Sequence, residues 1–175
     1  CFCRIVADVF YSRARGDMKE LKAEDLIRIY SLKPHPEGGF YRETYKSAAK
    51  DGRGRHYCTG IYFLLPRKAT SRLHRLRSDE MWHHYGGGAL TVGMIFPDGR
   101  EERVVFGPDA GAGEVQQFVV PAGTWFGAWP KPGAAFAFTG CTVSPGFEFS
   151  DFEFGDRAFL LKEFPASEKL IRLLT

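Results

Sequence analysis

Apolar and aromatic residues alternate with polar ones in short runs along most of this chain, and turns bearing Pro or Gly separate the runs. This pattern predicts β-strands. From residue 57 onward the predicted strands are Tyr57–Leu65, Ser71–Leu76, Met81–Tyr85, Ala89–Phe96, Glu102–Phe106, Gln116–Val120, Thr124–Trp129 and Ala135–Val143. The turn Pro97-Asp98-Gly99 is a hairpin signal between two of them. Since no helical pattern intervenes, the strands predict an antiparallel sandwich or jelly-roll barrel.

Helical spacing occurs at the two ends of this strand-rich region. Residues Lys19–Leu32 place Leu21, Leu26, Ile29 and Tyr30 close to helical spacing and end beside Pro34, which stops a helix. A strand is predicted at Phe40–Tyr45. The segment Pro165–Leu174 predicts a short terminal helix with Ser167 as its N-cap. We therefore expect one domain over residues 18–175, with residues 1–17 as an extension outside the fold.

Composition narrows the class of protein. The chain has 175 residues, of which 44% are hydrophobic and 26% charged, values typical of one globular domain. Its net charge of +3 is spread without a long single-sign run, so nucleic acid is not an expected partner. No apolar run is long enough to cross a membrane. We expect a cytoplasmic protein.

Two short segments resemble the metal-binding motifs of cupin barrels. His74, Glu80 and Gly87 keep the spacing of the first cupin motif, but Leu76 stands where the second histidine is expected. In the second motif, Pro121-Ala122-Gly123 is followed by Phe126 where another ligand would stand. Because neither Leu nor Phe coordinates an ion, we predict a barrel that binds an organic molecule without a metal or other cofactor.

Further segments resemble one branch of the cupins, the cupin-5 family. They are His35–Arg42, His74-Arg75, Asp79–His83, Val120–Gly123 with Trp125, and Gly140–Phe152. The family's barrel is similar to that of the RmlC-type sugar-nucleotide epimerases. The resemblance implies an all-β fold, an antiparallel double-stranded β-helix (jelly roll) with short N- and C-terminal helices. It also implies a homodimer that pairs through N-terminal strands, for which Phe40–Tyr45 is the candidate.

Strand parity suggests which side chains enter the barrel. If Glu80 points inward, Trp82 and His84 follow it on the same face. The cupin match places His74 inward, and Arg72 and Leu76 share its parity. An imidazole, a carboxylate and an indole would together make a small-molecule site. The alternative is that His74 and Glu80 only satisfy each other as a buried pair.

The expected ligand is a phosphorylated small molecule, a nucleoside diphosphate or a nucleotide-linked sugar. Trp82 or Trp125 would stack on its base or sugar, Phe126 would make the pocket more apolar, and arginines would hold its phosphate. The candidate arginines are Arg42, Arg72 and Arg75. Arg42 has an alternative interpretation as a surface arginine paired with Glu43.

If the protein is an enzyme, the RmlC resemblance implies epimerisation or isomerisation. One of His74 and Glu80 would abstract a proton next to a carbonyl, and Tyr41 would return one. A binding or sensor module without turnover and a metal-dependent oxygenase or isomerase are the alternatives. The phenylalanines of the last motif, Phe147, Phe149, Phe152 and Phe154, are interpreted as core or barrel floor.

Overall fold

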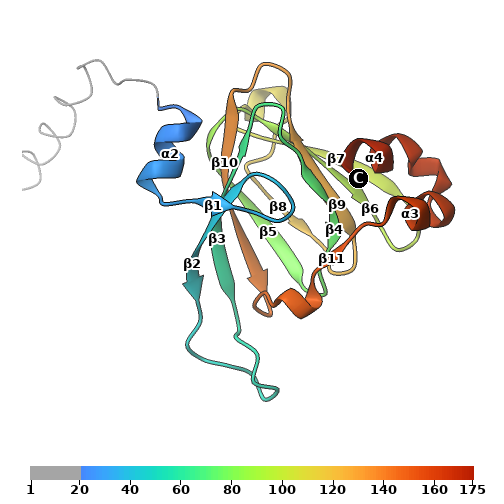
Figure 1. Cartoon of the computed structure of the whole chain (residues 1–175), viewed down its shortest axis with the longest axis horizontal. Helices are drawn as coiled ribbons and strands as arrows, with labels where there is room; N and C mark the ends of the chain where they lie inside the picture. The colour runs from blue at the N-terminus through green and yellow to red at the C-terminus, as the bar shows by residue number, and fades with distance from the viewer. Residues whose placement is uncertain (1–20) are drawn as a thin grey trace, which may run out of the picture.

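A computed structural model describes residues 21–175, and the predicted extension at residues 1–17 lies outside the described residues. Two antiparallel sheets face each other and enclose the interior of a barrel (Figure 1). This arrangement confirms the predicted all-β jelly roll with short helices at its two ends. None of the helices within residues 21–175 is long and apolar enough to span a bilayer. The cytoplasmic location stays a prediction.

The first sheet has six strands. In spatial order they are β1 (Lys33–Pro34), β2 (Phe40–Lys46), β3 (Thr59–Pro66), β10 (Phe136–Ser144), β5 (Asp79–Gly87) and β8 (Gln117–Val120). The second sheet has five strands. They are β11 (Glu153–Phe154), β4 (Ser71–Arg75), β9 (Trp125–Pro130), β6 (Leu90–Ile95) and β7 (Glu101–Phe106). Every strand predicted from residue 57 onward is present, with its ends within two residues of the expected ones.

The helices cover the outer faces of the two sheets (Figure 1). Helix α2 (Ala23–Ile29) lies within the predicted Lys19–Leu32, while α3 (Arg157–Glu163) was not predicted. Helix α4 (Glu168–Leu174) follows Ser167 as expected, but the Ser167 hydroxyl is buried without a partner and makes no cap hydrogen bond. The short 3-10 helices are η2 (Ala110–Ala112), η3 (Phe149–Asp151) and η4 (Pro165–Ser167).

Apolar side chains form three clusters. The largest lies between the sheets and includes Trp82, Phe106 and Phe126. A second packs the outer face of the second sheet against α3 and α4, and a third packs the first sheet against α2. Gly93 on β6 permits the close approach of α4, because a Cβ there would lie 2.5 Å from a Leu170 methyl carbon. The layers therefore leave the barrel interior as the place for a site.

Candidate functional site

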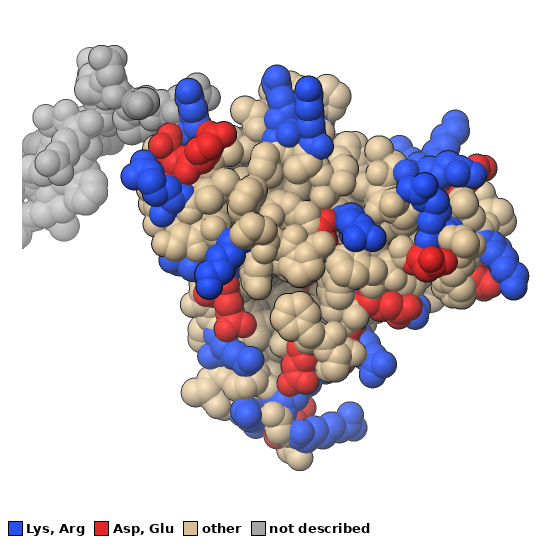
Figure 2. Space-filling view, viewed as in Figure 1, with Lys and Arg blue, Asp and Glu red and all other residues tan. Residues whose placement is uncertain are grey.

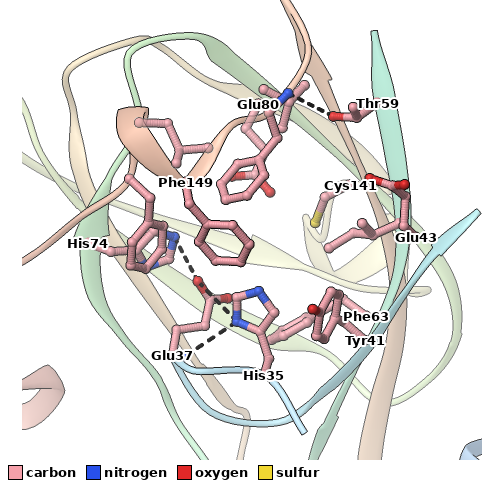
Figure 3. Close-up of a pocket in the computed structure, with 15 residues that line it drawn as sticks. His35, Glu37, Tyr41, Glu43, Thr59, Phe63, His74, Glu80, Cys141 and Phe149 are labelled. Atoms are coloured by element: carbon pink, nitrogen blue, oxygen red, sulfur yellow. Dashed lines mark hydrogen bonds and ion pairs between the residues drawn. The ribbon is translucent and has the colours of Figure 1, made fainter. Parts of the chain in front are cut away.

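One end of the barrel encloses a cavity of about 260 Å³. Its wall comes from the turn before β2, from strands β2, β3, β4, β5 and β10, and from the segment after β10 (Figure 3). The lining residues are His35, Glu37, Tyr41, Glu43, Thr59, Ile61, Phe63, His74, Leu76, Glu80, Cys141, Val143, Phe147, Phe149 and Phe152. None of them is Lys or Arg.

A tight turn brings Glu37 into the barrel. Gly38 has φ +114°, and a Cβ there would lie 2.1 Å from the carbonyl oxygen of Thr70. Only glycine allows this conformation and this close approach. The Arg72 amide also donates to the Glu37 carbonyl at 2.8 Å. The turn is thus pressed onto the start of β4, and the Glu37 side chain is buried beside that strand.

An irregularity in β4 decides which of its side chains enter the cavity. Ser71 pairs with Ala128 and His74 with Phe126, so β4 uses one more residue than β9 over this interval. This is a β-bulge, which breaks the alternation of faces. Ser71 and His74 are both buried, whereas Arg72 is exposed. The parity expected from the sequence, with Arg72 inward beside His74, is wrong for this reason.

His74 and Glu37 form a buried ion pair. The His74 Nε2 lies 3.0 Å from the Glu37 Oε2, and Nδ1 lies 2.7 Å from the Arg72 carbonyl oxygen. Since a carbonyl and a carboxylate only accept, both ring nitrogens donate and the ring is an imidazolium. The Ser71 hydroxyl donates to the other Glu37 oxygen at 3.0 Å. The partner of His74 is Glu37 rather than Glu80, so the predicted His74–Glu80 pair is not the one that forms.

The charges of this pair stabilise each other. Burial alone lowers the pKa of His74, but the Glu37 charge and its hydrogen bond outweigh burial and raise that pKa above its ordinary value. Burial raises the pKa of Glu37, and the opposing effects of His74, His35 and Ser71 bring it below its ordinary value. The pair is therefore charged at neutral pH.

Glu80 has a different environment. Burial and the nearby Glu37 charge raise its pKa to about 7, while His74 and a hydrogen bond from the Cys141 thiol act in the opposite direction. Within the part of the chain that the structure describes, Glu80 makes no ion pair. Glu80 lines the cavity, and the residue is only 7% exposed. Glu80 is thus a buried carboxyl group that titrates near neutrality.

His35 stands at the cavity wall as a neutral imidazole. Its Nδ1 accepts from the Glu37 amide at 3.3 Å, so the proton of the neutral ring resides on Nε2. For this reason the 3.7 Å approach of Nδ1 to the Glu37 carboxylate is not a hydrogen bond. Burial, the largest effect, lowers the pKa of His35. The ring packs edge-on against Tyr41 and Phe63, with centroid distances of 4.5 and 5.9 Å.

The structure brings together the three predicted catalytic residues and leaves the predicted arginines outside. His74, Glu80 and Tyr41 all line the cavity. The Arg42 guanidinium lies 5.7 Å from the Tyr62 ring centre. It forms no ion pair with Glu43. Arg42 neighbours the inward Tyr41 on β2, so the strand turns it to the other face.

The other two arginines lie over aromatic rings outside the cavity. The Arg72 guanidinium lies 4.7 Å from the Phe154 ring centre. Arg75 lies over Trp125 at 4.5 Å and pairs with Glu153 at 2.7 Å. Neither lines the cavity, so their role in ligand binding stays a prediction without a place in this site.

The remaining predicted ligand contacts also lie outside the lining. Trp82 and Phe126 are 1% exposed members of the cluster between the sheets. Trp125, which alternates with the inward Phe126, belongs to the outer cluster under α3 and α4. The His84 Nε2 lies 3.4 Å from the Gly88 carbonyl oxygen, and the ring packs edge-on against Phe106. Trp82 follows Glu80 inward as predicted, but it is packed rather than open to the cavity.

The residues present do not suit a cupin-type metal ion. Leu76 lines the cavity, and Phe126 places its ring centre 4.1 Å from that of His74. Both nitrogens of His74 donate hydrogen bonds, so no lone pair is free for a metal. Among residues 21–175, no three His, Cys, Asp or Glu side chains are arranged to hold an ion. The metal-free site itself stays a prediction.

Sequence analysis did not assign His35, Glu37, Glu43 or Cys141 to the site. Their signals were weak. Glu37 is followed by a glycine pair, while Glu43 and Cys141 lie in strands with an ordinary pattern. Phe147 and Phe152 line the cavity and pack against the cluster between the sheets, in agreement with the core interpretation. Phe149 also lines the cavity but is 65% exposed, so this ring covers the cavity mouth and is no part of a packed core.

Comparisons with known proteins agree with the barrel and the motifs. Residues 24–155 match the cupin-5 family, described as "Cupin superfamily (DUF985)". An uncharacterized protein of Saccharomyces cerevisiae, YML079W, is 30% identical over 169 residues, which cover 86% of this chain and 83% of that protein. Among solved structures, protein SO0799 from Shewanella oneidensis is 40% identical with a TM-score of 0.84, covering 89% of this chain and 98% of that one.

Two further solved structures are similar to this chain, one closely and one distantly. A hypothetical protein from Leishmania major is 37% identical with a TM-score of 0.81, covering 89% of this chain and 99% of that one. Bacillus subtilis oxalate decarboxylase is 15% identical with a TM-score of 0.54, covering 83% of this chain and 38% of that one. The last similarity shows the fold alone.

Proposed function

For this chain, which belongs to the cupin-5 family of the cupin superfamily, we propose that the cavity binds a small organic molecule. We propose further that Glu80 transfers a proton to or from it. The reaction class is epimerisation or isomerisation next to a carbonyl group. The observation that carries this proposal is the Glu80 carboxyl group, buried and without an ion-pair partner among the described residues, at the wall of an aromatic-lined cavity.

Glu80 has the properties of a general base. A catalytic base works best when its pKa lies near the working pH, and the pKa of Glu80 is raised to about 7. Strongly shifted titratable groups in cavities are candidates for catalysis. The Cys141 thiol is a weak donor, so lone pairs of the carboxylate remain for a substrate proton. Of the two bases considered from the sequence, the geometry supports Glu80.

His74 is a positioning residue in this proposal. Both of its N–H groups are used within the protein, by Glu37 and by the Arg72 carbonyl. Donors available to a substrate are the His35 Nε2–H and the Tyr41 hydroxyl, both at the cavity wall. Either could donate to the oxygen of a carbonyl or return a proton to carbon.

The size of the cavity limits the substrate. Sites for drug-sized ligands commonly enclose about 300–1,000 Å³. This cavity of about 260 Å³ therefore suits a smaller molecule, such as one ring with short substituents. Tyr41, Phe63 and the rings after β10 provide flat apolar contacts for it.

The nucleotide-linked sugar of the sequence-based prediction is a second candidate. One observation favours it: a groove lined by Arg75 and Arg77 adjoins the cavity and shares Leu76 and Phe152 with it. A sugar could occupy the cavity while its phosphate contacts these arginines. Since no lining residue of the cavity itself is Lys or Arg, the phosphate would have to lie in the groove.

We also propose a homodimer that pairs through β2. Strand β1 contacts only Phe40 and Tyr41, which leaves the rest of this sheet edge, through Lys46, without a neighbouring strand among the described residues. Exposed edges of this kind are normally covered. Sedimentation at micromolar concentration should show a dimer, and a species of 19.7 kDa alone would contradict the proposal.

Proton transfer can be tested without knowing the product. Cyclic ketones, hydroxyketones and sugars, all neutral, and the anionic nucleotide sugars would be incubated with the protein in D₂O. NMR would detect deuterium in place of a C–H proton. We expect exchange that Glu80→Gln abolishes and Glu163→Gln, an exposed control on α3, preserves. Binding without exchange in any compound would favour the sensor alternative. Exchange that survives in Glu80→Gln would refute the role of Glu80.

A further inference from the structure

The charged groups of the cavity leave an excess of negative charge. The His74 imidazolium and the Glu37 carboxylate neutralise each other at 3.0 Å. Glu80 in the wall and Glu43 on β2 then remain, and neither forms an ion pair within residues 21–175. Figure 3 shows both at the wall of the same cavity. A ligand that brings a positive charge would be the counter-ion that this end of the barrel lacks.

Arg55, which contacts the segment after β10, does not supply that charge. Arg55 forms an ion pair with Asp151 and donates to the Gly146 carbonyl at 2.8 Å. It also donates to the Ser78 hydroxyl. These contacts hold the segment that carries the covering phenylalanines and pair the Arg55 charge with Asp151. Arg55 is not part of the cavity lining.

Aromatic rings surround the space between the two carboxyl groups. Tyr41 and Phe63 belong to the barrel wall, while Phe147, Phe149 and Phe152 belong to the segment after β10. The face of an aromatic ring carries a partial negative charge and attracts cations. The protein already uses this attraction at the cavity wall, since the His74 imidazolium stacks on Phe152 with ring centres 5.1 Å apart.

We propose that the natural ligand carries a positively charged nitrogen, a protonated amine or a quaternary ammonium group, held by these rings and by Glu80 and Glu43. This inference rests on the proposed function only in using the same cavity. A buried carboxylate without a cation is costly, and the ligand would remove that cost. The ammonium group would also hold Glu80 in its ionised form, the form that proton abstraction requires.

Matched probes separate charge from shape. Choline and 3,3-dimethylbutanol have nearly the same shape but differ in charge, as do benzylamine and benzyl alcohol. We expect each cation to bind about tenfold or more tightly than its neutral partner, the range of a desolvated cation–π contact. Titration calorimetry would measure this ratio at low salt. Benzyl phosphate serves as the anionic probe and should be the weakest.

Variants test whether the preference for a cation over its neutral partner arises in this cavity. Glu43→Gln removes a negative charge from the cavity and Phe149→Leu removes a ring, so each should reduce the preference for choline over 3,3-dimethylbutanol several-fold. Both residues are exposed, so we expect the variants to fold. Glu43→Lys should raise the affinity for benzyl phosphate. Glu163→Gln, a carboxylate outside the cavity, should change neither ratio. The same preference in Glu43→Lys as in the parent chain would overturn the assignment.

The outcomes are distinct from those of the deuterium-exchange experiment. Equal affinity for cation and neutral isostere, tighter binding of benzyl phosphate, or no binding of any cation at millimolar concentration would each overturn the cationic ligand. Cation selectivity without deuterium exchange would retain this inference and remove the proposed proton transfer. Exchange with neutral substrates and no cation preference would retain the proposed proton transfer and remove the cationic ligand.

Discussion

The two ends of the barrel interior share strands β3, β5 and β10 but differ in what fills them. Strand β5 directs Glu80 into the cavity and, two residues later, Trp82 into a packed cluster. Trp82 is 1% exposed and packs edge-on against Phe106 and Phe126. Facing inward on a strand therefore does not decide whether a residue is core or site. What decides it is how far along the barrel axis the residue lies and whether an aromatic ring packs against it.

The two ends also differ in their polar groups. In the packed cluster, the buried Trp82 Nε1 has no hydrogen-bond partner. At the cavity end, His35, Glu37, His74 and Glu80 interact with one another within the same wall. Closely packed rings stabilise a fold, whereas buried ionisable groups stabilise it only in pairs. We expect the packed end to carry stability and the open end to carry binding, with Glu37 and His74 as the exception.

Truncation of the packed cluster should have the largest effect. Trp82→Ala removes a fully buried ring and should lower the free energy of unfolding by about 3–5 kcal/mol. Phe149→Ala is the matched change at the cavity mouth, where the ring is 65% exposed, and should stay within about 0.5 kcal/mol. Denaturant unfolding would measure both. A similar loss in the two variants would remove the distinction between the two ends.

Breaking the buried ion pair should come next. Glu37→Gln leaves the His74 imidazolium without its counter-charge and should cost on the order of 3 kcal/mol. By the same reasoning, His74→Ala should impair folding as well as binding. Glu43→Gln, an exposed carboxylate of the same cavity, is the control and should leave stability unchanged. Equal unfolding midpoints for Glu37→Gln and the parent chain would show that the pair contributes nothing.

The pH dependence of stability should report Glu80. Its folded pKa of about 7 lies above the ordinary value of 4.5, so the folded state holds its proton more tightly than the unfolded state. The resulting stabilisation is complete below pH 4.5 and is lost as pH rises toward 7. From pH 5 to 7 the parent chain should lose on the order of 2–3 kcal/mol that Glu80→Gln retains. Parallel stability curves for the two proteins would contradict the raised pKa.

Removal of metal should have the smallest effect, because His74 has no free lone pair and Leu76 and Phe126 cannot bind an ion. Treatment with a chelator should leave both the melting temperature and the affinity for choline unchanged. Elemental analysis of the purified protein provides the control. Stoichiometric iron, manganese or zinc whose removal abolishes binding would place a metal in this barrel after all.

Much of the fold follows from the chain's local pattern. Alternating residues and turns bearing glycine or proline predict each strand from residue 57 onward to within two residues. They do so because the two faces of a strand differ in burial along its whole length. Helix α3 was missed, since its seven residues carry little periodic signal and depend on packing against the second sheet.

Only part of the site followed from the sequence. His74 and Glu80, expected inward from the cupin motif, and Tyr41, suggested by the RmlC resemblance, all line the cavity. Arg72 was misplaced because a bulge in β4 depends on pairing with β9. Glu37 reaches His74 only because the turn at Gly38 packs against Thr70, a contact between segments that are distant in sequence. The sequence by itself determined the strands and the inward carboxyl group of Glu80. The tertiary structure decided its neighbours, and hence its pKa, because burial and charge at one atom depend on several separate strands.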